Sequence, residues 1–85
     1  MPLFIIERNF AEQLELTKDA AHQVKRINDD SGVKWLYSFL SADKKKTYCL
    51  YEAPSADAIR AAAKIANIPA DVVTPVSELR PEQFA

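Results

Sequence analysis

The chain has 85 residues, 48% of them hydrophobic, and a formal net charge of −1 at pH 7. This length fits one domain, residues 1–85. The slightly negative charge argues against nucleic acid or an anionic membrane surface as a partner. A single cysteine cannot form an internal disulfide and suits a reducing cytoplasm. The apolar run near the N-terminus is too short for a signal peptide or a membrane span, so we expect a cytoplasmic protein that does not enter a membrane.

The first part of the chain predicts a strand followed by a helix. Residues 3–8 open with consecutive apolar side chains, which is typical of a central strand covered on both faces. A connector follows over residues 10–16. Thr17 is the expected N-cap of a helix over about residues 17–29, because its hydroxyl can accept a hydrogen bond from the first turn. Gly32 can then take the positive φ with which helices often end.

The middle of the chain predicts a β-hairpin. Residues 33–41 and 47–53 are rich in β-branched and aromatic side chains, and the charged segment 43–46 lies between them. Two such runs joined by a short polar turn are typical of paired antiparallel strands.

The last part predicts a second helix, a strand and a tail. Ser55 is the expected N-cap of a helix that ends near Asn67. Residues 72–79 predict a strand at a sheet edge, since Pro75 cannot donate a backbone hydrogen bond. Residues 81–85 predict a tail. The resulting order of strands and helices predicts an α+β, ferredoxin-like βαββαβ fold, with a four-stranded antiparallel sheet and two helices on one face.

The face of the sheet without helices decides how the chain assembles. Alternation along three strands places apolar side chains on both faces of the sheet. In residues 33–41, one face carries Val33, Trp35, Tyr37 and Phe39, and the other carries Leu36 and Leu40. In the same way Cys49 and Tyr51 lie opposite Tyr48 and Leu50, and Leu3 and Ile5 lie opposite Phe4 and Ile6. A large exposed apolar face favours a homodimer. The alternative is that the connector and the tail cover that face. Four aromatic residues are candidates for lining the interface or a ligand cleft within it: Trp35, Tyr37, Tyr48 and Tyr51.

Three side chains are candidate metal ligands, each with a structural alternative. His22 is a nitrogen ligand or a solvated helix residue. Cys49 is a thiolate ligand or a small buried hydrophobe. Asp43 is an oxygen ligand or a cap of the hairpin turn. No paired His or Cys spacing indicates a closed zinc site. A Gly-rich phosphate loop is excluded because the chain has one glycine.

An RNA-binding function is a further possibility, because RNA-recognition domains share the predicted strand order and stack bases on sheet aromatics. Their third strand alternates glycines and aromatic residues after a basic residue. The segment 46–51 reads K-T-Y-C-L-Y and lacks the glycines and the spacing. We therefore expect no nucleic-acid partner.

Several segments together resemble a known family: F-I-I-E-R-N-F from Phe4, V-K-W-L-Y-S-F from Val33, K-T-Y-C-L-Y-E-A-P from Lys46 and I-P-A-D from Ile68. The chain resembles a family of small bacterial proteins of unknown function that includes a nickel-binding, nickel-responsive protein with a dimeric ferredoxin-like fold. The resemblance implies this fold, a homodimer and nickel. Many members carry histidine where Tyr37 and Ala62 stand, and nickel favours nitrogen ligands. A nickel site here would need Cys49, His22 or carboxylates such as Asp43, with both subunits as possible donors.

Three functions compete. The first, which we favour, is a small binding protein that holds a metal ion such as nickel, or a small ligand, in a cleft at the dimer interface. The second is an enzyme of the dimeric α+β-barrel type, in which Tyr37, Cys49 and His22 would supply acid or nucleophile groups. The third is a purely structural or interaction dimer. Of these three functions, the enzyme is the one that we favour least.

Overall fold

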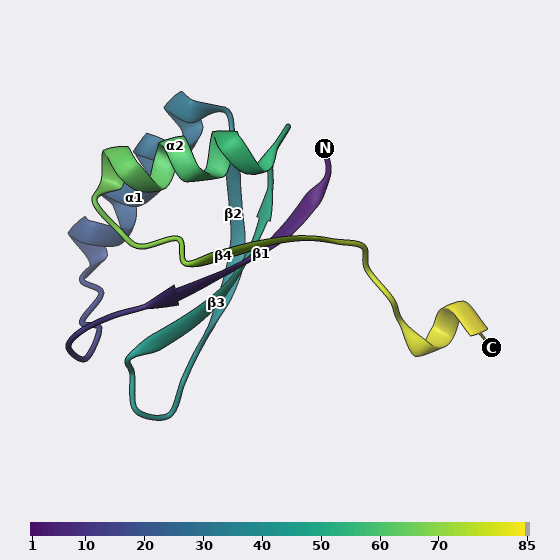
Figure 1. Cartoon of the computed structure of the whole chain (residues 1–85), viewed down its shortest axis with the longest axis horizontal. Coiled ribbons are helices and arrows are strands. Elements are labelled where there is room, and N and C mark those ends of the chain that lie inside the picture. Colours follow the sequence, from purple (N-terminus) through teal and green to yellow (C-terminus); the bar gives the residue numbers. More distant parts are fainter. Residues whose placement is uncertain (85) are drawn as a thin grey trace.

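The computed structural model describes residues 1–84, and its elements follow the predicted order (Figure 1). They are β1 (Leu3–Asn9), α1 (Lys18–Ser31), β2 (Lys34–Leu40), β3 (Lys46–Glu52), α2 (Ala56–Ala66), β4 (Val72–Val76) and the short 3-10 helix η1 (Pro81–Phe84). The four strands form one antiparallel sheet in the order β2-β3-β1-β4. Both helices lie on the same face (Figure 1). The predicted α+β, ferredoxin-like fold is confirmed.

The predicted helix caps are present. Thr17 Oγ1 accepts a hydrogen bond from Ala20 N at 3.1 Å, and Gly32 ends α1 with a φ of 73°. Ser55 Oγ accepts a hydrogen bond from Ala58 N at 3.2 Å at the start of α2. These side-chain acceptors satisfy backbone N–H groups that would otherwise lack a partner. Helix α1 runs to Ser31, slightly further than expected, because Gly32 is the first residue to leave the helical conformation.

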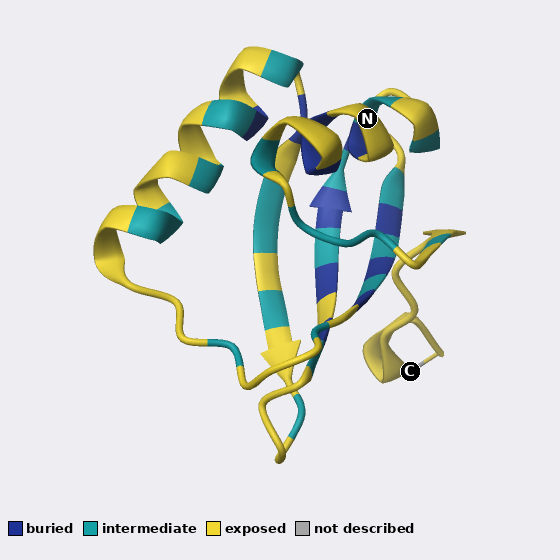
Figure 2. Cartoon of the chain, turned by 60° about the vertical axis from the view of Figure 1, so that its left-hand side comes forward, coloured by how far each residue is buried: buried dark blue, intermediate teal, exposed yellow. Residues whose placement is uncertain are grey.

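The core lies between the sheet and α2. Alternate residues of the two central strands, β1 and β3, are buried, and Figure 2 shows this alternation along both strands. Ile6 and Ile59 are the largest fully buried side chains. The other core residues are Phe4, Val33, Cys49, Tyr51, Ala53, Ala62 and Ala63. Burying this apolar surface is the main favourable contribution to folding.

A β-bulge in β2 overturns one expectation. The pairing of β2 with β3 shifts register between Trp35, which pairs with Tyr51, and Tyr37, which pairs with Leu50. Trp35 therefore shares the helix-covered face with Tyr51 and packs partly buried against the core. Tyr37 shares the opposite face with Leu50. The prediction that Val33, Trp35, Tyr37 and Phe39 lie on one face is wrong, because an extra residue in one strand reverses the alternation beyond it.

The last strand is shorter than expected and the chain then leaves the sheet. Strand β4 ends at Val76, and Pro75 lies within it on an edge strand, as predicted. Residues 77–84 extend away from the sheet, and η1 lies outside it (Figure 1). Of the predicted tail, residues 81–84 form η1 and are exposed, and Ala85 is outside the described residues. None of the helices in residues 1–84 combines the length and apolar character that crossing a membrane requires.

Candidate functional site

The face of the sheet opposite the helices is apolar and uncovered. It consists of alternate residues of the strands, and we call it the open face: Leu3, Ile5, Glu7, Tyr37, Phe39, Tyr48, Leu50 and Val72. The exposed fractions of Tyr37, Phe39 and Tyr48 are 55%, 65% and 39%. The rings of Tyr37 and Phe39 pack edge to face with centroids 5.8 Å apart. Large contiguous apolar patches are rare on the surfaces of monomeric proteins.

Neither segment that could have covered this face does so within residues 1–84. The connector pairs with the hairpin turn through Phe10 N to Lys45 O and Leu14 N to Lys44 O, at 2.8 and 2.7 Å. Its apolar side chains lie on the helix side of the sheet, next to Arg8 and Cys49. The segment 77–84 extends away from the sheet (Figure 1).

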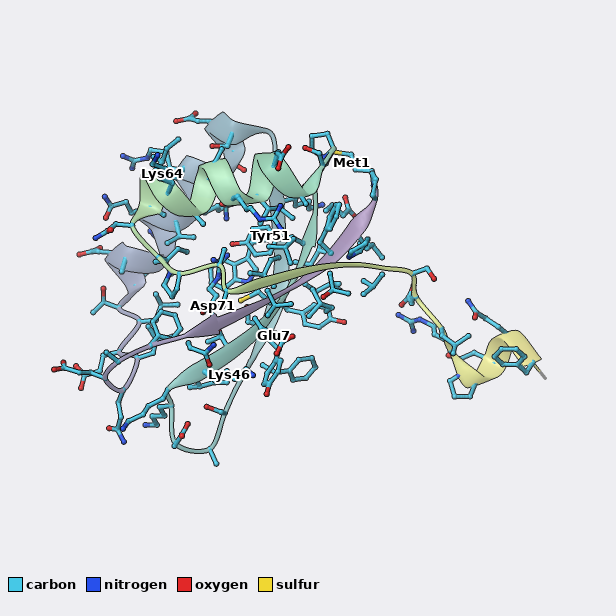
Figure 3. All side chains as sticks on the ribbon, viewed as in Figure 1. Met1, Glu7, Lys46, Tyr51, Lys64 and Asp71 are labelled. Atoms are coloured by element: carbon cyan, nitrogen blue, oxygen red, sulfur yellow. The ribbon has the colours of Figure 1, made fainter. Side chains whose placement is uncertain are left out.

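One charge pair lies on the open face. Lys46 Nζ is 3.0 Å from Glu7 Oε1 and 5.0 Å from the centroid of the Tyr48 ring. Figure 3 shows Glu7 and Lys46 next to each other, away from the helices. The hydrogen bond to Glu7 raises the pKa of Lys46 above its ordinary value of 10.5. The face thus combines aromatic side chains with one charge pair that is already matched.

A groove of about 330 Å³ opens on the other side of the sheet, between α1 and strands β2 and β3. We call it the α1 groove. Its volume is at the lower end of the usual range for small-molecule sites, about 300–1,000 Å³. The walls are apolar: Phe10, Leu14, Leu16, Val24, Leu40 and Ile68. The floor carries Arg8, Trp35, Ser38, Thr47, Cys49 and Tyr51. Asn28 is the one residue of α1 that is buried.

Arg8 is a buried cation at the floor of the α1 groove, with 3% of its surface exposed. Its Nη1 donates a hydrogen bond of 2.6 Å to Pro69 O, and its guanidinium lies 5.7 Å from the centroid of the Tyr51 ring. The ion pairs of residues 1–84 do not include Arg8. Arg8 is not among the site residues predicted from the sequence, although it follows Phe4 and Ile6 at alternate positions and so falls on the helix-facing side of β1.

Tyr51 connects Arg8 to α1. Asn28 Nδ2 donates a hydrogen bond of 3.2 Å to Tyr51 Oη, and both residues are buried. Burial raises the pKa of the Tyr51 hydroxyl above its ordinary value of 10.0, and Arg8 and Asn28 offset part of that rise. Figure 3 shows Tyr51 between the sheet and the helices. The hydroxyl therefore stays protonated at neutral pH and helps to hold Arg8 in place.

Cys49 and Trp35 complete the floor. Cys49 is buried, and its Sγ donates a long hydrogen bond of 3.6 Å to Thr47 Oγ1. Trp35 Nε1 donates a hydrogen bond of 2.8 Å to Ser38 Oγ, which ties the two sides of the β-bulge together. Of the four aromatic candidates, Trp35 and Tyr51 therefore line the α1 groove, whereas Tyr37 and Tyr48 lie on the open face. The sheet separates the two pairs.

The candidate metal ligands do not meet. His22 is exposed on α1, in a depression of about 590 Å³ that Lys25 and Lys34 also line. The Asp43 carboxylate accepts hydrogen bonds from Ser41 Oγ at 2.6 Å and Lys45 N at 3.0 Å, so it caps the turn, and the bond from Ser41 lowers its pKa below the ordinary value of 3.8. Within residues 1–84 no group of three or more His, Cys, Asp and Glu could hold a metal ion. The His, Cys, Asp and Glu side chains of residues 1–84 are therefore not grouped as metal ligands within one chain.

The catalytic set considered from the sequence is not assembled either. Tyr37 and Cys49 lie on opposite faces of the sheet, and His22 lines a different depression from Cys49. A general acid or base must reach its partner within hydrogen-bond distance or through one water. The three residues cannot act on one substrate within a single chain.

Comparison with known proteins gives one family and one solved structure. A family model described as "Nickel responsive protein SCO4226-like" matches residues 4–76. The crystal structure of SCO4226 from Streptomyces coelicolor A3(2) is similar, with a TM-score of 0.71 and 23% sequence identity, over 92% of this chain and 99% of that chain. At this identity the structural similarity supports the fold. No curated protein matches the chain.

Proposed function

The chain belongs to the SCO4226-like family, described as nickel responsive proteins, and from this premise we propose that it is a cytoplasmic, non-enzymatic homodimer that binds a small ligand in the α1 groove. The observation that carries the ligand-binding role is the groove itself. It is an apolar cavity of about 330 Å³ with a few polar groups on its floor. This combination is typical of small-molecule sites.

The open face supports the homodimer. Tyr37, Phe39 and Tyr48 would be covered if two copies packed their sheets face to face around a twofold axis, the commonest symmetry of soluble oligomers. A second copy presents the same aromatic side chains and the same Glu7–Lys46 pair, and a twofold axis would bring these two identical patches together. In this proposal the ligand site and the interface lie on opposite sides of each sheet, so the ligand is assigned to the α1 groove and not to a cleft at the dimer interface.

Trp35 provides the assay for ligand binding, because it is the only tryptophan of the chain and lines the groove. We expect saturable changes in its emission when small amphipathic compounds of one chain length are titrated: a carboxylate, an alcohol and an amine. If none of the three changes the emission, the groove is not a ligand site. Light scattering on the same samples tests the homodimer independently, and a single-chain mass at all concentrations would refute it.

Nickel binding is the second candidate, and the family description supports it. The donors described above do not meet in one chain, so a nickel site would have to join residues from two copies. Calorimetric titration of tag-free protein with nickel chloride separates the two candidates. We expect no heat of binding and no copurifying metal. A saturable signal at one ion per dimer would favour the nickel function instead.

A further inference from the structure

We propose that the ligand of the α1 groove is a small organic carboxylate, held with its carboxylate against Arg8 and its apolar part along the connector and α1. The inference rests on the proposed ligand-binding role of the groove and adds the chemical class of the ligand.

The first reason is the unneutralised charge of Arg8. A guanidinium is always protonated in proteins and offers five N–H donors in a planar fork. Arg8 is 3% exposed and donates one of these hydrogens to Pro69 O. Burial of a charge is costly unless an opposite charge pairs with it. Among residues 1–84 no carboxylate comes within 4.0 Å of this guanidinium. An anionic ligand would supply the missing partner.

The second reason is the position of Arg8 within the groove. The residue lines the floor, and the contacts with Pro69 and Tyr51 hold its side chain in one place. A donor that is already ordered loses little entropy when a ligand binds. Thr47 lies on the same floor and accepts the Cys49 thiol hydrogen, which leaves its own hydroxyl hydrogen for another acceptor. A carboxylate has two oxygens that can use both donors.

The third reason is the apolar wall, which favours an organic ligand over an inorganic anion. The residues around the floor are aliphatic or aromatic, with Leu14, Val24 and Leu40 among them. Phosphate or sulfate would exchange its hydration for one cation and an apolar surface, which is unfavourable. A carboxylate with a hydrocarbon part instead buries apolar surface along these walls while its charged end reaches Arg8.

The test compares three compounds of equal length, hexanoate, hexan-1-ol and hexylamine, by Trp35 emission. We expect hexanoate to bind about tenfold or more tightly than the other two, because its carboxylate accepts charge-assisted hydrogen bonds from Arg8, whereas hexan-1-ol is uncharged and the ammonium group of hexylamine is repelled by the guanidinium. Equal binding of hexanoate and hexan-1-ol would refute the carboxylate inference and leave the groove as a site for neutral ligands. Absence of binding by all three would refute both the inference and the ligand-binding role.

Substitutions at the mouth of the groove test the charge without disturbing the core. Leu40 lines the groove and is 49% exposed on the edge strand β2, so charged residues should be tolerated there. We expect Leu40→Glu to weaken hexanoate binding and Leu40→Lys to preserve or strengthen it. The same affinity in both variants would overturn the proposal.

Arg8→Met removes the charge itself at similar length. If it folds, we expect the preference for hexanoate over hexan-1-ol to fall by about tenfold or more. Arg60→Met is the matched control, because Arg60 is an exposed cation on α2 that pairs with Asp57 and does not line the groove. An Arg8→Met protein that keeps the wild-type preference would refute the role of Arg8. If this variant does not fold, the comparison of Leu40→Glu with Leu40→Lys tests the proposal instead.

Discussion

Phe39→Asp is the substitution that most directly tests the open face. Phe39 is 65% exposed on the edge strand β2, beside Tyr37, so the change should not disturb the fold of one chain. Full burial of a phenylalanine side chain contributes about 1.5–3 kcal/mol. Covering the exposed two thirds of Phe39 then contributes about 1–2 kcal/mol per copy, or about 2–4 kcal/mol for both copies of a twofold dimer.

Loss of this contribution would raise the dissociation constant of the dimer about 30- to 700-fold, since each 1.4 kcal/mol is about a factor of ten. The introduced carboxylate adds to the effect, because two uncompensated charges would have to leave water at the interface. Sedimentation velocity over a dilution series measures the constant directly. Circular dichroism on the same samples shows whether the single chain keeps its fold.

Ile65→Asp is the matched control. Ile65 is 66% exposed, almost the same fraction as Phe39, but it lies on α2, which covers the other face of the sheet. We expect Ile65→Asp to dimerise like the wild type. The reasoning is refuted if the wild type sediments as a single chain at about 100 µM, a concentration well above the dissociation constants of typical stable dimers. It is also refuted if the Phe39→Asp and Ile65→Asp dimers dissociate equally.

Three further predictions concern stability. Ile59→Ala should lower the free energy of unfolding by about 2–5 kcal/mol in urea titrations, because Ile59 is 1% exposed and its loss leaves a cavity; a loss well under 1 kcal/mol would mean that the core collapses around it. Burial raises the pKa of Tyr51 above 10.0 in the folded protein, so this hydroxyl ionises at a lower pH in the unfolded chain. The wild type should therefore lose stability as the pH rises from about 10 towards the pKa of the folded state. Tyr51→Phe should flatten this loss, and an unchanged pH profile of stability would contradict the prediction. Gly32→Ala should cost about 1–2 kcal/mol in thermal melts, because Gly32 has a φ of 73° and an added Cβ would meet no atom within 4 Å, which leaves backbone strain as the cause; an unchanged melting temperature would refute this.

The features that the sequence predicted correctly depend on neighbouring residues. Thr17 and Ser55 cap the helices that follow them, and Gly32 ends the first helix, because each role needs only the local backbone and one side chain. The order of strands and helices follows from such local signals, and the antiparallel sheet follows from the order. Cys49 is buried, which agrees with the structural one of the two alternatives considered for it.

The β-bulge between Trp35 and Tyr37 could not be predicted in this way. The segment V-K-W-L-Y-S-F-L alternates regularly, and no glycine or proline marks an irregularity. The bulge depends on how β2 pairs with β3, and Trp35 gains both core packing and the hydrogen bond to Ser38 from it. One inserted residue therefore separates Trp35 from Tyr37, which regular alternation would have kept on the same side of the sheet.

Arg8 shows a different limit of sequence reasoning. Its helix-facing position follows from the alternation of β1, but its partner Pro69 lies in the loop after α2, 61 residues further along the chain. Only the folded structure shows that the guanidinium donates a hydrogen bond to a backbone carbonyl and that no carboxylate of residues 1–84 pairs with it. Arg8 was not predicted as a site residue because the alternation of β1 does not specify which groups surround its guanidinium.

The separation of the two faces also bears on nickel. Many members of the family that the sequence resembles carry histidine at the positions of Tyr37 and Ala62, but Tyr37 lies on the open face, whereas Ala62 is a buried residue of α2 on the other side of the sheet. Side chains at these positions in one chain cannot share a metal ion, so a ligand at position 37 would need its partners from the second copy. Metal binding of that kind depends on the dimer, whereas the α1 groove lies within one chain. Phe39→Asp should therefore leave hexanoate binding intact while it separates the copies, and a loss of hexanoate binding in this variant would mean that the groove and the interface are one site.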